Sequence, residues 1–232
     1  MTDRARVLEA LATVYDPELD EPVTAMGFVT SCTVTDGGDV EIRLRLPTHQ
    51  CAPNFAYLMV ADARDAVAGV PGVGEVRIAL EDHMTADEIN GAVASHAGFS
   101  GAFPGETTGE LDELRSLFQR KALIARESRV CEILRRRGLA VDEMAGLRVR
   151  DLPDGPEGAR CVALRELLGL DTRPDAPALV RPDGSAVAAE DMPRWLRMAD
   201  LARVSLEGNG SLCRGLLSRR YGIPDPEAEV AA

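Results

Sequence analysis

Apolar side chains in the N-terminal part of the chain repeat with two different periods. Over some segments they return every three to four residues, as on one face of a helix, and over others they alternate with polar residues, as on a half-buried strand. In chain order the expected elements are a helix at 4–15, strands at 28–35 and 40–46, a helix at 53–68 and a strand at 76–80. The order α-β-β-α-β predicts a small two-layer α+β domain over residues 1–90.

The remaining residues have a helical pattern that follows a glycine-rich interval. Gly91, Gly98, Gly101, Gly105 and Gly109 indicate a linker over residues 91–109. Residues 110–222 predict a mainly α-helical C-terminal domain, with helices expected at 111–137, 159–168, 192–202 and 211–221. The sequence Gly208-Asn209-Gly210 is expected to separate the last two helices. Residues 223–232 are expected to form a disordered tail.

Charge and cysteine content narrow the class of protein. The net charge is −12, and residues 1–95 hold 16 acidic and 6 basic side chains. This acidity argues against a nucleic-acid partner and against binding to an anionic membrane surface. The apolar segments are too short to span a membrane. The 5 cysteines lack paired spacing, which predicts free thiols and a cytoplasmic location.

Cys51 is the first candidate for chemistry. It lies in a polar loop immediately before the helix that begins near Pro53. Free N–H groups and the helix dipole favour a thiolate at such a position, and a thiolate can be a nucleophile or a soft metal ligand. The alternative is a small buried residue, because free cysteine is among the most buried residue types. His49, two residues earlier, could supply a second ligand to a metal bound at Cys51.

Asp16 and Glu18 form a second candidate site in an acidic turn after the first helix. Their carboxylates could be solvated, accept backbone hydrogen bonds, hold another loop or bind a hard cation, and the spacing does not choose among these. Cys131, Cys161 and Cys213 have no CxxC spacing and are expected to be core thiols.

Motifs in the first 90 residues resemble one known family. They are Asp16-Pro17-Glu18-Leu19, Met26-Gly27-Phe28-Val29, Thr48-His49-Gln50-Cys51-Ala52-Pro53 and Val70-Pro71-Gly72-Val73. In this order and spacing they resemble the iron–sulfur cluster assembly domain family of SufT and PaaD, over about residues 3–90. The fold of that family agrees with the order of elements expected above.

The resemblance implies a factor that delivers iron–sulfur clusters or iron to client enzymes. Cys51 matches the reactive cysteine of the family, and Asp16 and Glu18 match its acidic turn. Thr48 matches the loop threonine, and Gly27 matches the glycine at the entry to the sheet. The sequence departs from the family where Ala52 follows the cysteine and where Asp82-His83-Met84 replaces a tryptophan region.

A single cysteine cannot hold a cluster alone, since clusters usually take four ligands. The leading hypothesis is therefore a cytoplasmic, bacterial-type accessory protein without enzymatic activity. It would bind an iron–sulfur cluster or iron transiently at Cys51, in a homodimer or with ligands from a scaffold or client. By analogy the client apo-metalloenzyme would be an iron-dependent oxygenase. The alternatives are an adaptor or chaperone without metal, and an acyl- or sulfur-transfer enzyme with Cys51 as nucleophile and His49 as base.

Overall fold

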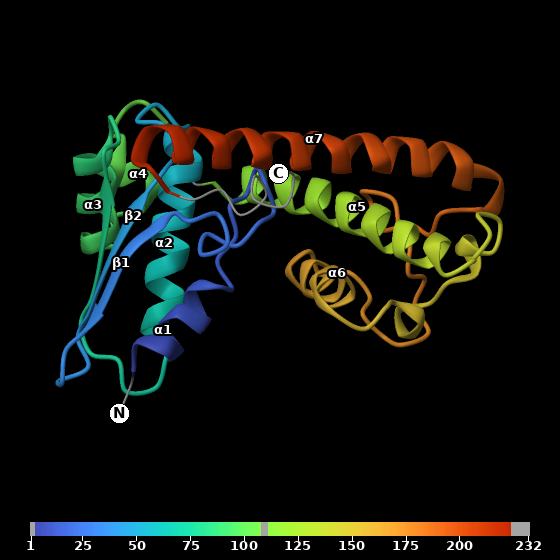
Figure 1. Cartoon of the computed structure of the whole chain (residues 1–232), viewed down its shortest axis with the longest axis horizontal. Helices are drawn as coiled ribbons and strands as arrows, with labels where there is room; N and C mark the ends of the chain where they lie inside the picture. The colour runs from blue at the N-terminus through green and yellow to red at the C-terminus, as the bar shows by residue number, and fades with distance from the viewer. Residues whose placement is uncertain (1–2, 108–110, 224–232) are drawn as a thin grey trace. The chain divides into compact units, whose positions relative to one another are not determined.

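The computed structural model describes residues 3–107 and 111–223 (Figure 1). The first part contains α1 (Arg4–Leu11), β1 (Val29–Val34), β2 (Val40–Arg45), α2 (Pro53–Ala68), β3 (Val76–Glu81), α3 (Ala86–Ser95) and α4 (Gly98–Ala102). The longer helices α5 (Asp112–Arg136), α6 (Pro156–Leu167) and α7 (Met192–Tyr221) follow, with short 3-10 turns at Met144–Gly146, Val149–Asp151 and Ala189–Asp191. The predicted fold class is confirmed.

The chain divides into two compact units, and α7 contributes to both. The first unit contains the residues up to Glu113 together with α7 from Asn209 onward, and the second contains Leu114–Gly208. The C-terminal domain that the sequence predicts at 110–222 therefore extends too far. The last turns of α7 belong to the first unit because Leu217 is buried in its core.

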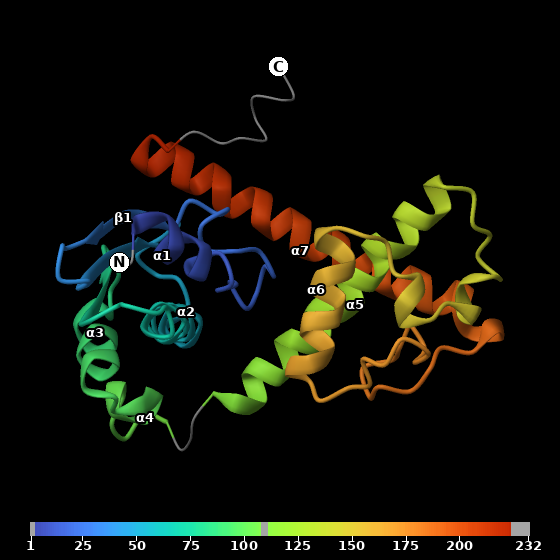
Figure 2. The same ribbon diagram turned by 90° about the horizontal axis from the view of Figure 1, so that it is seen from below.

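The sheet of the first unit has the strand order β1-β2-β3. β1 pairs with β2 antiparallel, and β2 pairs with β3 parallel. The strict alternation predicted for β2 is observed, since Val40, Ile42 and Leu44 are buried and the residues between them are not. α2 and α3 lie on one face of this sheet (Figure 2). The bounds of α2 match the prediction, with Pro53 in the first turn, where its missing N–H breaks no helical hydrogen bond.

The predicted linker at 91–109 is wrong over residues 91–102, which form most of α3 and all of α4. α3 is stabilised because Ile89, Ala92 and Val93 form one apolar face that is buried. Gly91 lies on the exposed side of this helix, where it lowers helix propensity without ending the helix. The tail predicted at 223–232 lies, apart from Ile223, outside the described residues.

α7 is one continuous helix where the sequence predicts two. Gly208 and Gly210 were expected to break it. Each glycine costs about 1 kcal/mol relative to alanine, but the burial of Leu206 and Leu217 on either side offsets this cost.

The second unit has an apolar interior in which the side chains of Glu127 and Arg165 are buried. Its buried residues include Cys131, Met144, Cys161, Leu164 and Trp195. Glu127 lies in this core, where its Oε2 accepts a hydrogen bond from Val180 N at 3.1 Å. The Arg165 guanidinium is 3.4 Å from the other carboxylate oxygen and also donates to the Ala178 carbonyl. Cys131 and Cys161 are core thiols, as predicted.

Candidate functional site

Residues 48–52, called the thiol loop below, connect the end of β2 to the start of α2. Thr48 orders this loop, because its Oγ1 accepts a hydrogen bond from Gln50 N at 3.3 Å and its carbonyl accepts one from Cys51 N at 3.4 Å. The same Oγ1 lies 3.5 Å from Cys51 Sγ. Cys51 is partly exposed and packs against the edge of the core of the first unit. The loop therefore presents the thiol at the position that the sequence predicts.

His83 fixes the thiol loop to the segment that follows β3. Its Nε2 is 2.7 Å from the Cys51 carbonyl oxygen, which can only accept, so Nε2 carries the proton. Its Nδ1 then accepts from Thr85 N at 3.3 Å. A second hydrogen bond, from Met84 N to the His49 carbonyl at 2.9 Å, joins the same two segments. His83 is buried and holds the loop, so its ring nitrogens are occupied by structural bonds.

Asp16 shapes the acidic turn between α1 and β1. Its Oδ1 accepts hydrogen bonds from Glu18 N at 2.8 Å and Leu19 N at 3.0 Å. Burial, with a smaller contribution from the charge of Glu18, raises the pKa of Asp16 to about 6 against the lowering effect of these two N–H groups. Of the roles that the sequence leaves open, the observed one is acceptance of backbone hydrogen bonds. Ligation of a cation by Asp16 or Glu18 stays a prediction.

Gly27 lies between the acidic turn and β1, with φ +73°. Other residues are strained in this left-handed region, so the chain needs glycine here. Phe28 N then donates to the Val23 carbonyl at 3.0 Å and directs the backbone into β1. This agrees with the role of a glycine at the entry to the sheet.

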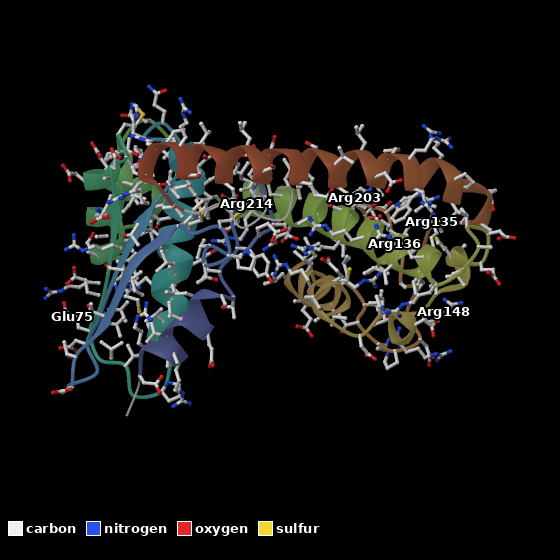
Figure 3. All side chains as sticks on the ribbon, in the orientation of Figure 1. Glu75, Arg135, Arg136, Arg148, Arg203 and Arg214 are labelled. Carbon is white, nitrogen blue, oxygen red and sulfur yellow. The ribbon has the colours of Figure 1, made fainter. Side chains whose placement is uncertain are left out.

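The last turns of α7 add side chains to this part of the first unit that the sequence analysis did not assign to it. Arg220 donates to Asp82 at 3.1 Å and lies 3.4 Å from His49 Nδ1. Tyr221 OH donates to the same carboxylate at 2.6 Å. Arg214, which Figure 3 labels on this helix, is 3.5 Å from Met26 Sδ. Side chains of α7 thus contact His49 of the thiol loop, Met26 before β1 and Asp82 after β3.

Cys213, which the sequence predicts to be a core thiol, lies on α7 in the same unit as Cys51. It is partly buried and packs against the same core as Cys51. Burial is the main cause that raises the pKa of Cys213 to about 12, with smaller contributions from Asp16, Cys51 and Glu18. Its apolar spacing with Leu217 and Tyr221, four residues apart along one helix face, is the sequence signal that could have placed it.

The site brings together thiols and carboxylates from three segments without forming a complete metal shell. Within the described residues, no group of three or more histidine, cysteine, aspartate or glutamate side chains is arranged to hold a metal ion. His49 contacts Arg220, and Thr48 is the side chain next to the Cys51 sulfur. Cys51 is thus a partly exposed thiol in the thiol loop.

Comparisons with known proteins identify the family of the first part of the chain. A family profile described as iron-sulfur cluster assembly protein matches residues 4–78. An uncharacterized protein of Methanocaldococcus jannaschii is 34% identical over 91 residues, which are 39% of this chain and 93% of that protein. The chain belongs to the iron–sulfur cluster assembly protein family. Cys51, Thr48 and the acidic turn fall inside the residues that the family profile matches, and Cys213 falls outside them.

This family member is also similar to part of longer proteins. Iron-sulfur cluster carrier proteins of Mycobacterium leprae and Mycobacterium tuberculosis are 33% identical over 78 residues and 36% identical over 77 residues. These matches cover 34% and 33% of this chain, and the chain spans 20% of the length of each carrier protein. No solved structure matches the chain at a comparable level. No helix in the described ranges has the length and apolar character needed to cross a bilayer.

Proposed function

We propose that this chain is a non-enzymatic maturation factor that carries an iron–sulfur cluster, or iron, to a client apo-metalloenzyme. The family match over residues 4–78 carries the proposal, together with the partly exposed Cys51 in the matching loop. Thiolates are the ligands that iron–sulfur clusters and soft metal ions prefer. The similar carrier proteins are named for the same cargo.

The incomplete ligand set suits transfer. A cluster usually takes four ligands, whereas this unit offers Cys51 with Cys213 nearby. We infer that the other ligands come from the client, a scaffold protein or a second copy of the chain. Exchange of those ligands would release the cargo. Asp16, Glu18 and His49 are proposed as accessory donors during this exchange.

The proposed client recognition rests on the second unit, which lies outside the family match. The client class that we propose, on analogy alone, is an iron-dependent oxygenase. The free state of all 5 cysteines fits an action in the reducing cytoplasm. No catalytic step is assigned to this chain.

Metal content after anaerobic purification and reconstitution with ferrous iron and sulfide tests this function. We expect the wild-type chain to retain iron and sulfide, and Cys51→Ser to lose most of both and to fail to activate the client in cells. Cys213→Ser should weaken retention more mildly. Cys131→Ala is the matched control, because it removes a buried thiol of the second unit and should leave the iron content unchanged.

Two outcomes would contradict the proposal. A chain that binds no iron under any reconstitution, yet supports full client activity, would be an adaptor. A Cys51 that turns over an acyl or sulfur donor would make the chain an enzyme. Full client activity with Cys51→Ser would exclude the transfer role.

A further inference from the structure

β3 is the last strand of its sheet, and its outer edge is open over most of its length. The ladder with β2 uses the odd-numbered residues of this segment, as in the 2.8 Å bond from Val40 N to the Glu75 carbonyl. In a parallel ladder, the N–H and C=O groups of alternate residues point to opposite sides of the strand, so those of the even-numbered residues point away from β2. The N–H and C=O groups of Val76, Ile78 and Leu80 therefore point away from the sheet.

The Asn90 side chain covers one of these three positions. Its Oδ1 accepts from Leu80 N at 2.8 Å, and its Nδ2 donates to the Leu80 carbonyl at 3.1 Å. The carboxamide thus replaces the peptide group of a neighbouring strand at Leu80. Across the described ranges, the outward backbone groups of Val76 and Ile78 have no hydrogen-bond partner. At the other edge of the sheet, Arg4 of α1 donates to the Cys32 carbonyl at 3.2 Å.

A groove of about 530 Å³ runs beside this open edge. It lies between β3 and the helices α2 and α3, and its lining includes Arg64, Ala68, Val76, Ile78, Val93 and Ala94. Val76 and Ile78 are half-buried and pack against the core. An unpaired strand edge with a groove beside it is the geometry that accepts an added strand, which pairs through its backbone and places alternate side chains in the groove.

We propose that this edge pairs with the β3 edge of a second copy of the chain, antiparallel and centred on Val76. In this register the two Val76 residues exchange both backbone hydrogen bonds. Glu75 then lies opposite the partner's Arg77, and by symmetry this pair occurs twice.

The charges and the small residues of the region support a second copy as the occupant. Glu75 and Arg77 are on the exposed face, where they form a solvent-exposed pair with each other at 2.9 Å. Figure 3 shows Glu75 projecting outward from the sheet. Ala94 of α3 lines the groove, and Gly91 and Ser95 of the same helix are also small and exposed, so a second α3 can approach closely beneath the joined sheets.

This pairing goes beyond the proposed function and does not depend on it. Cys51 is anchored by residues that follow the C-terminal end of β3, whereas the proposed two-fold axis passes through its N-terminal end. Two antiparallel β3 strands place the thiol loops at opposite ends, about 30 Å or more apart at about 3.3 Å per residue. The dimer would therefore present two separate cargo sites.

Sedimentation equilibrium of the full chain over a range of concentrations tests the pairing. We expect a reversible dimer for the wild type. Glu75→Arg and Arg77→Glu each place like charges opposite each other twice, so each should raise the dissociation constant by roughly tenfold. The double variant Glu75→Arg/Arg77→Glu restores opposite charges and should return the constant close to the wild-type value. Glu9→Arg is the matched control, because it reverses an exposed charge on α1, away from β3.

Val76→Pro gives an independent test. Proline removes an outward N–H at the first residue of an edge strand, where no bond within the chain is lost, so the fold should persist by circular dichroism while the dimer dissociates. A wild type that is monomeric at every concentration would overturn the proposal and leave the edge to an extended segment of a client. A dimer that survives Val76→Pro, or a double variant that fails to recover, would overturn it as well.

Discussion

The Cys51 carbonyl accepts a hydrogen bond from the buried His83 ring, and Thr48 Oγ1 lies beside the Cys51 sulfur. These contacts give a surface thiol a fixed position without burying it. Asp16 acts in the same way in the acidic turn, since two backbone N–H groups converge on its Oδ1. Thr48 and Asp16, which belong to the motifs that resemble the family, therefore hold loops in place in this structure.

Substitutions at Asp16 separate the structural role from ligation. Asp16→Ala leaves the N–H groups of Glu18 and Leu19 without their acceptor and should destabilise the chain by about 1–3 kcal/mol in urea unfolding. Asp16→Asn keeps an acceptor and should cost less. If Asp16→Asn also keeps the iron content of the wild type, the carboxylate is structural; loss of iron in this folded variant would instead identify Asp16 as a ligand.

At the scale of elements, the C-terminal segment of α7 is a structural part of the first unit. Leu217 is 1% exposed in the core of that unit, whereas Leu212 on the same helix is 63% exposed. Arg220 and Tyr221 both bond to Asp82 and hold the end of the helix to the segment after β3. A helix that the sequence assigns to another domain thus completes this core.

Leu217→Ala should destabilise the first unit by about 2–5 kcal/mol, because it leaves a cavity in a closed core. Leu212→Ala is the matched control and should change stability by less than about 0.5 kcal/mol, since its side chain is exposed. Hydrogen exchange of β1 and β2 peptides measures the effect on this unit. Equal effects of the two substitutions would show that α7 does not contribute to this core.

Sequence periodicity predicts the elements whose packing is local and misses those that depend on distant contacts. β2 alternates strictly and α2 begins at a proline, so both were predicted to within one residue at each end. Glycines led to a false linker at α3 and a false break in α7, because burial of Ile89 and Leu217 outweighs their cost. Cys51 was found from a local motif, whereas Cys213 reaches the same core only through the tertiary fold.

At the scale of the whole molecule, the two units have separate apolar cores, so the unfolding of each unit can be followed by a different measurement. Trp195 is the only tryptophan, and it lies in the second unit, where its Nε1 donates to the Val180 carbonyl at 3.2 Å. Its fluorescence therefore reports the unfolding of that unit. The same residue, Val180, donates its N–H to the buried carboxylate of Glu127.

Stability of the second unit should decrease as the pH rises. Burial raises the pKa of Glu127 from an ordinary value of 4.5 to about 8, although Val180 N–H and the Arg165 charge lower it. Between these values the folded protein holds a proton that the unfolded chain has released, so the free energy of unfolding falls with rising pH and levels off above about pH 8. Glu127→Gln does not titrate and should lack this decline.

Urea unfolding followed by Trp195 fluorescence at several pH values between 5 and about 8.5 checks this linkage. Glu166→Gln, at an exposed position of α6, is the control and should follow the wild type. If the free energies of unfolding of the wild type and Glu127→Gln change in parallel with pH, the proposed linkage to Glu127 is wrong.

The return of α7 to the first unit has a consequence for synthesis. A ribosome makes the sheet and Cys51 early, but Cys213 and Leu217 emerge only near the end of translation. The nascent chain therefore cannot complete the core of the first unit until almost the whole polypeptide has been made. A product truncated before Asn209 would contain Cys51 but lack Cys213 and Leu217, and the core of its first unit would be incomplete.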